Sequence, residues 1–144
     1  MTALTVVTAV ACGLVGGVFF VFSTFVMSGL RASPPDVGLQ AMQSINRRAP
    51  TPLFMLAFIG TAIACVVLGV WSVFDGAALR AAGCGLYLVT IVVTGVYHVP
   101  RNNALLATDD PSAWTAYAGP WVAWNHLRTL ASLAAAVLLT VSLT

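Results

Sequence analysis

Four long apolar stretches dominate this sequence and limit the folds that it can adopt. They cover residues 3–30, 52–74, 78–99 and 121–143. A helix needs about 20 apolar residues to cross the hydrocarbon core of a bilayer, and in lipid every backbone polar group must be satisfied internally. The sequence therefore predicts an all-α integral membrane protein, in which residues 1–144 form a single domain, an antiparallel bundle of four transmembrane helices.

Composition agrees with a lipid environment and excludes some partners. Only 7% of the residues are charged and 60% are hydrophobic, whereas soluble domains carry roughly 25% charged residues. All six basic residues are arginines and all four acidic residues are aspartates, so the sequence has no basic patch that would bind nucleic acid. We expect the lipid bilayer to be the main partner, and self-association into a homo-oligomer stays open.

The arginines are distributed unevenly between the loops. Arg80 lies alone in the region of the second loop, whereas four belong to the first and third loops: Arg31, Arg47, Arg48 and Arg101. Positively charged loops tend to remain in the cytoplasm. We therefore predict a multi-pass protein of the cell membrane with loops one and three in the cytoplasm and both termini outside.

Loop one carries the signals of a short interfacial helix. In "SPPD" at 33–36, Ser33 is a candidate cap, Pro34 a candidate first helical residue, and Asp36 completes a capping box. A predicted helix then extends to about residue 47 and lies on the membrane face. Its apolar positions recur at helical spacing: Leu39, Met42 and Ile45.

The remaining loops are predicted from their turn residues. Asp75 and Gly76 indicate a tight turn between the second and third spans. Asp110 is expected to cap a turn led by Pro111. Gly119 and Pro120 are expected to close that turn and begin the fourth span.

Polar stripes follow one face of each span and are richest on the last two. At ~100° per residue, each of these two stripes falls within an arc of about 100°. The third span contributes Tyr87, Thr90, Thr94, Tyr97 and His98, and the fourth contributes Trp121, Trp124, Asn125, Arg128 and Ser132. Small residues on such faces usually serve close helix packing, but that interpretation does not cover Arg128.

Arg128 needs a separate explanation, because a charge within a span is costly by a few kcal/mol. No acidic residue lies within any of the four apolar stretches. Three explanations remain open: the side chain extends toward the cytoplasmic surface, forms a long pair with Asp109 or Asp110, or serves a ligand.

Antiparallel geometry brings four helix ends together and predicts a cavity just inside the cytoplasmic leaflet. The third and fourth spans meet there, and loop one adds Asn46 and Arg47. The expected lining is Tyr97, His98, Asn102, Asn103, Trp121, Trp124, Asn125 and Arg128, with walls formed by Phe19, Phe22, Phe25 and Met55. Such a cavity suits a small, flat, hydrophobic aromatic ligand.

The chemistry of this lining is limited by what it contains. Aromatic faces can stack, amides can donate to a carbonyl or phenolate, and one imidazole and one permanent cation are present. Carboxylates are absent, which excludes glycosidase, aspartic protease and carboxylate-bridged di-iron chemistry.

Metal and haem sites have only weak signals. The cysteines Cys12, Cys65 and Cys84 lack metal-binding spacing, so we interpret them as small buried residues. Haem or copper bound through His98 and His126 is an alternative. It is disfavoured because His126 lies ~100° from the stripe that carries Arg128.

Three segments carry a resemblance to a known family. They are "MQSINRR" at 42–48, "VPRNN" at 99–103 and "WVAWNHLRT" at 121–129, with weaker support from "GGVFFVFSTFVM" at 16–27. The chain resembles, nearly end to end, the small four-span membrane proteins of the anthrone oxygenase family, also known as a domain of unknown function. It differs at His98, where many members have an asparagine.

The resemblance implies oxidation of an anthrone to the corresponding anthraquinone by molecular oxygen, on a polyketide-like aromatic substrate. The functional residues that it implies are Asn46, Asn102, Trp121, Trp124, Asn125 and Arg128. They fall in the cavity that spacing predicts.

A mechanism follows as a hypothesis. His98 or Tyr97 removes a C–H proton, and Arg128, Asn125 and Asn102 stabilise the oxyanion, so no cofactor is required. His98, Asn125 and Arg128 are thus the candidate catalytic residues. The candidate substrate-binding residues are Asn46, Tyr97, Asn102, Asn103, Trp121 and Trp124. A membrane module that binds haem or a quinone, and a structural subunit without catalysis, are the alternatives.

Overall fold

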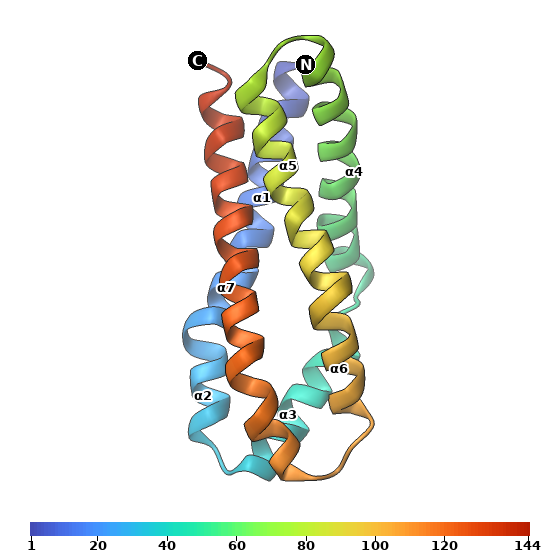
Figure 1. The fold of residues 1–144 in the computed structure, drawn as a ribbon, viewed down its shortest axis with the longest axis vertical. Coiled ribbons are helices and arrows are strands. Elements are labelled where there is room, and N and C mark those ends of the chain that lie inside the picture. Colours follow the sequence, from blue (N-terminus) through green and yellow to red (C-terminus); the bar gives the residue numbers. More distant parts are fainter.

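Seven α-helices and two π-helical turns make up the protein in a computed structural model that describes residues 1–144 (Figure 1). The first span is α1 (Thr2–Val21), a π turn η1 (Phe22–Val26) and α2 (Met27–Ala32). Helix α3 (Pro35–Arg48) follows, then α4 (Pro52–Phe74). The third span is α5 (Ala78–Val93), a π turn η2 (Thr94–His98) and α6 (Val99–Leu106), and α7 (Pro111–Val141) ends the chain.

The four long segments form an antiparallel bundle, as predicted. Helix α7 packs against both α1 and α5, and α4 closes the ring against α5 and α1. Both termini and the α4–α5 turn lie at one end of the bundle, whereas α2, α3, α6 and the start of α7 lie at the other (Figure 1). Four helical segments are long and apolar enough to cross a membrane: Thr2–Ala32, Pro52–Phe74, Ala78–Leu106 and Pro111–Val141.

Two spans differ from their predicted bounds because prolines do not end the helices. The third span continues through Pro100 to Leu106 instead of ending at residue 99. Pro100 lies in the first turn of α6, two residues after η2 has changed the backbone hydrogen-bond register, so its missing N–H costs little.

The prediction that Gly119 and Pro120 close a turn is also wrong. Helix α7 begins ten residues earlier than expected, at Pro111, and Pro120 lies inside it on the exposed surface. A membrane helix tolerates an internal proline where its surroundings satisfy the freed backbone groups.

The predicted cap at Ser33 is wrong, and the predicted cap at Asp110 is confirmed. Ser33 does not cap α3: its hydroxyl donates to the Gly29 carbonyl oxygen at 3.2 Å, and α3 begins at Pro35 rather than Pro34. Asp110 does cap α7, because its Oδ1 accepts the Ser112 N–H at 2.9 Å. The α4–α5 turn contains Gly76 at a φ of +70°, a conformation that favours glycine.

Helix α3 lies across the end of the bundle (Figure 1). Its apolar residues Leu39 and Met42 are buried against protein, in one cluster with Trp114 of α7. The Gln43 amide donates to the carbonyl oxygens of Leu105 at 2.9 Å and Thr108 at 2.8 Å. The helix therefore covers the end of the bundle with its apolar face. The prediction from the sequence, that this face lies on the membrane surface, is wrong.

The interior has two apolar clusters. The cluster toward the termini contains Cys12, Cys65 and Cys84, all free and buried as predicted. The cluster under α3 contains Met27, Trp114, Tyr117 and Trp121, among others. Polar side chains lie where the two clusters meet, and these form the candidate site.

Candidate functional site

Arg128 is buried at the junction of the two clusters, with 6% of its surface exposed. Its Nη1 donates to the Thr94 hydroxyl at 3.1 Å, and its Nη2 donates to the Asn125 Oδ1 at 2.6 Å. The guanidinium carbon lies 4.3 Å from the ring centre of Phe19 and 5.4 Å from that of Trp121. Arg128 therefore neither extends to the surface nor pairs with an aspartate.

Charge compensation for Arg128 comes from neutral groups. The protein has one ion pair, between Arg80 and Asp75 at the opposite end of the bundle. Aromatic faces attract a cation more strongly when both are removed from water, so Phe19 and Trp121 help to hold the charge. The guanidinium Nε has no hydrogen-bond partner and remains available to a ligand.

Asn125 positions Arg128 and is itself fully bonded. Its Nδ2 donates to the Phe19 carbonyl oxygen at 2.8 Å and to the Ser23 hydroxyl at 2.7 Å. The same hydroxyl lies 3.2 Å from that of Thr129. Because its donors and its acceptor are used inside the protein, Asn125 orients the cation and leaves no group for a substrate.

The two π turns supply the partners of this network. Ser23 lies in η1, and Thr94 is the first residue of η2, one on each side of α7. A π turn widens the helix and changes its hydrogen-bond register, and such turns are frequent at functional sites. Here the Ser23 hydroxyl faces Asn125 of α7, and the Thr94 hydroxyl faces Arg128 of α7.

Asn102 forms the second polar centre of the site. Its Oδ1 accepts the Tyr117 hydroxyl at 2.7 Å and the Trp121 indole N–H at 3.0 Å. Trp121 is thereby fixed with one face toward Arg128. The bond requires α6 to continue past Pro100, because Asn102 lies in that continuation.

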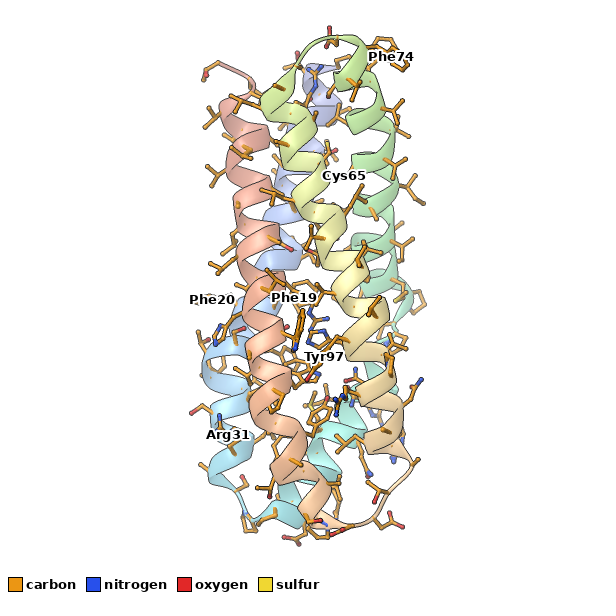
Figure 2. The ribbon with its side chains drawn as sticks, in the orientation of Figure 1. Phe19, Phe20, Arg31, Cys65, Phe74 and Tyr97 are labelled. Carbon is orange, nitrogen blue, oxygen red and sulfur yellow. The ribbon has the colours of Figure 1, made fainter.

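His98 is buried beside Trp121, and the two rings meet edge to face at 5.0 Å between centres. Its Nδ1 lies 3.4 Å from the Val93 carbonyl oxygen, and its Nε2 has no partner. Tyr97 lies on the outer side, stacked on Trp124 at 4.9 Å between ring centres. Figure 2 shows Tyr97 between the lower parts of α5 and α7.

A cavity of about 100 Å³ opens beside Arg128. Three polar residues reach it, namely Asn46, Asn102 and Arg128. Both the Asn46 Nδ2 and the Arg128 Nε are buried without a hydrogen-bond partner. The remaining walls are apolar or aromatic: Val18, Phe19, Phe22, Met42, Ile45, Phe54 and Trp121.

The cavity lies near the α3 end of the apolar zone. Phe54, in the first turn of α4, forms part of its wall. Helix α4 has 23 residues, about 35 Å at 1.5 Å per residue, which matches a hydrocarbon core of about 30 Å. The site therefore lies at the start of the α4 span, near one end of the apolar zone, and beneath α3.

The structure brings together five of the nine predicted site residues and leaves the other four apart from the cavity. Asn46, Asn102, Trp121 and Arg128 line the cavity, and Asn125 supports it from behind. His98 contacts Trp121 without lining the cavity, Tyr97 and Trp124 stack outside it, and Asn103 is exposed.

Among the predicted walls, Phe19 and Phe22 line the cavity, whereas Phe25 and Met55 are exposed on the outer surface. Figure 2 shows Phe19 inside the bundle and the neighbouring Phe20 on its outer side. His126 is exposed, whereas His98 is buried. No group of three or more histidine, cysteine or acidic side chains is arranged to hold a metal ion.

Sequence reasoning missed Tyr117, Ser23 and Thr129 as members of the site. Tyr117 was assigned to a turn, although a helix from Pro111 places it one turn before Trp121 on the same face. Ser23 belongs to the polar stripe of the first span, but only the packing of α1 against α7 shows that it faces Asn125.

A comparison with protein families finds a match to the part of the chain that carries most of these residues. The family model for anthrone oxygenase matches residues 52–138, more than half of the chain. The chain belongs to the anthrone oxygenase family. The match covers α4 to most of α7 and so includes Asn102, Trp121, Asn125 and Arg128. No curated protein and no solved structure matches the chain.

The part of the chain outside the family match completes the site. Helix α1 provides Phe19, η1 provides Ser23, and α3 provides Asn46. Family membership suggests an oxygenase-like role. The geometry adds a buried cation, an unpaired amide and aromatic walls around one cavity.

Proposed function

We propose that this protein oxidises a membrane-dissolved aromatic ketone of the anthrone type with molecular oxygen, in the cavity beside Arg128. The observation that carries this proposal is the pair of unpartnered donors, Arg128 Nε and Asn46 Nδ2, in one aromatic-walled cavity. Preorganised donors of this kind stabilise an oxyanion as it forms. An anthrone carbonyl acquires such a charge when its ring system loses a proton.

The overall reaction needs no electron donor besides the substrate. One anthrone and one O2 give one anthraquinone and one water. The carbon opposite the carbonyl loses its two hydrogens and gains one oxygen atom, and the second oxygen atom leaves as water. Deprotonation gives an enolate, whose carbanion carbon transfers electrons to O2 and forms a hydroperoxide. Loss of water from that hydroperoxide gives the quinone.

In this proposal Arg128 and Asn46 bind the enolate oxygen, and Trp121 and Phe19 contact the faces of the rings. Asn125 is a positioning residue, because all its polar atoms are bonded within the protein. His98 does not line the closed cavity, so we assign it proton removal only after the cavity has widened: its Nε2 is unpartnered and its ring contacts the cavity wall at Trp121. No metal or haem is required by these steps.

Substrate entry requires the cavity to widen. Its volume of about 100 Å³ is below the roughly 300–1,000 Å³ of typical ligand sites. Phe22 and Phe54 are partly buried side chains of the wall, so their rotation can admit a tricyclic ring without unfolding a helix. Turnover in this protein should therefore include an opening step.

The test is turnover of anthrone by purified, metal-chelated protein in detergent, followed as quinone formation and O2 consumption. Arg128→Met should lower kcat/KM by about 10²-fold, as expected for loss of an oxyanion donor. Arg128→Met leaves the Asn125 Oδ1 without its donor and so lowers stability, and thermal unfolding in detergent is measured beside activity to separate the two effects. Arg101→Met is the matched control, since Arg101 is an exposed arginine of the same end of the bundle.

Each alternative gives a different result in the same experiment. Loss of anthrone affinity without any wild-type turnover would indicate a binding module, and loss of folding in Arg128→Met would indicate a structural role. Complete dependence on added metal or haem would contradict the cofactor-free mechanism. Unchanged kcat in His98→Asn would remove His98 from proton transfer.

A further inference from the structure

An apolar groove lies on the outer surface of α1 and adjoins the cavity. Its volume is about 540 Å³. Gly13 and Gly17, which have no side chains, form its floor. The groove and the cavity share two wall residues, Val18 and Phe22. No charged side chain lines the groove, so it suits a hydrocarbon chain and not a polar ligand.

Gly17 has no packing role that would explain it. A Cβ atom built at Gly17 would meet no other atom within 4 Å, whereas one at Gly16, the preceding residue, would meet Leu133 at 3.0 Å. Glycine in a helix interior costs about 0.5–1 kcal/mol relative to alanine. Gly16 offsets this cost by close helix contact, whereas Gly17 makes no such contact and leaves the groove open along α1.

The adjoining cavity provides the polar groups that favour a ligand at this place. Only 6% of the Arg128 surface is exposed, and its Nε has no hydrogen-bond partner in the protein. Because Val18 and Phe22 line both spaces, a substituent on a ring in the cavity would pass these two residues to enter the groove.

We propose that the natural ligand is an amphipathic aromatic molecule whose ring oxygen binds at Arg128 and Asn46 and whose alkyl or prenyl chain lies in the Gly13–Gly17 groove. This inference rests on the proposed function for the ring and goes beyond it in assigning the chain. It makes Gly17 a specificity-determining residue. Phe22, which separates the two spaces, is the residue that must rotate when the ligand enters.

The test compares two ring ligands that differ only in their chains, 2-methylanthrone and 2-decylanthrone. Their dissociation constants are measured by quenching of tryptophan fluorescence, at one detergent concentration and without reference to turnover. Gly17→Leu fills the groove and should raise the Kd of the decyl compound by about fivefold or more, while the methyl compound changes by less than about twofold. Detergent partitioning of the decyl chain cancels, because each ligand is compared between variants.

Gly29→Leu is the matched control, because Gly29 is a helical glycine whose Cβ would also meet nothing within 4 Å and which does not line the groove. It should leave both dissociation constants unchanged. Val21→Phe narrows the same groove from another position and should repeat the loss for the decyl compound. It also keeps the proposal testable if Gly17→Leu does not fold.

Two results would overturn the groove assignment. One is an equal effect of Gly17→Leu on both ligands, which would mean that lipid or detergent chains occupy the groove. The other is an equally large effect of Gly29→Leu. If no anthrone is turned over but the chain-dependent loss is seen, the proposed oxygenase function fails and the chain-binding groove stands.

Discussion

A buried guanidinium without a carboxylate partner is the central feature at the scale of single residues. Arg128 is held between the two apolar clusters by the Thr94 hydroxyl, the side-chain Oδ1 of Asn125 and two aromatic rings. Removing one partner from such a network leaves the others unsatisfied, which costs more than the lost bond alone. The Asn125 side chain makes hydrogen bonds to three residues of this network, Phe19, Ser23 and Arg128.

We expect Asn125→Ala to lower the free energy of unfolding by about 1–3 kcal/mol. The substitution leaves Ser23 and the Phe19 carbonyl oxygen without their donor and Arg128 without its best acceptor. Denaturant unfolding in detergent measures the effect. Asn103→Ala, at an exposed asparagine, should stay within about 0.5 kcal/mol of the wild type. Equal effects of the two substitutions would show that the network is not stabilising.

At the scale of elements, α3 completes the site by covering the end of the bundle. It supplies Asn46 and two apolar cavity residues, Met42 and Ile45. Its position depends on a close approach at Gly38, where an added Cβ would collide with the Trp114 indole and lie 3.0 Å from the Leu30 carbonyl oxygen. Gln43 adds two hydrogen bonds to the α6–α7 connection.

Gly38→Ala should therefore destabilise the protein by about 1–3 kcal/mol, as overpacking does, and lower substrate affinity by displacing Asn46. Gly85→Ala is the comparison, because a Cβ at Gly85 in α5 meets nothing within 4 Å. That substitution should stabilise by about 0.5–1 kcal/mol through helix propensity. Thermal unfolding gives both values, and the same sign for the two would contradict the packing of α3.

The start of α7 depends on Asp110. The Ser112 hydroxyl donates to its Oδ2 at 2.6 Å, and this bond, with that of the Ser112 N–H, holds the pKa of Asp110 below its usual range. A carboxyl whose folded-state pKa is lowered stabilises fully above its unfolded-state pKa, and the contribution is lost as pH falls through the lowered value.

Asp110→Asn keeps a capping side chain without the charge, so the midpoint temperature of the wild type should exceed that of the variant near pH 7. The difference should shrink as the pH falls through the lowered pKa of Asp110 and disappear below it. Midpoints measured over this pH range decide the point. A difference that stays constant with pH would show that the charge of Asp110 does not stabilise α7.

At the scale of the whole molecule, the bundle places both termini at one end and α3 with the candidate site at the other (Figure 1). In the proposed orientation the site lies at the cytoplasmic edge of the membrane, because four arginines belong to that end. A hydrophobic ligand would then reach the site from the bilayer through the face of α1.

Single cysteines at exposed positions test this arrangement, since the three native cysteines are buried. Thr2→Cys and Thr144→Cys should react with a membrane-impermeant maleimide in intact cells, and Ala49→Cys only after the cells are opened. Opposite behaviour of the two termini would contradict the bundle itself. The reverse pattern for all three positions would contradict only the orientation inferred from the arginines.

Sequence alone determined the fold class, because burial of backbone polar groups in lipid leaves little choice for four apolar stretches of this length. It also singled out Arg128, Asn125 and Trp121, because side chains with polar groups are conspicuous in an apolar stretch. Asn46 and Asn102 lie outside the four stretches, and they were singled out by the antiparallel arrangement of the loops and by the family resemblance. The capping role of Asp110 and the turn at Gly76 were predictable for a similar reason, since both depend on local chain geometry.

Only the tertiary structure decided where the third and fourth spans end or begin and which groups face the cavity. Pro100 and Pro120 look like helix ends in sequence, but neighbouring π turns and helices accommodate them. Spacing along one helix could not separate Trp124, which is exposed, from Trp121, which is buried. Which residues share a helix face follows from local periodicity, whereas the face that is buried depends on contacts between helices distant in sequence.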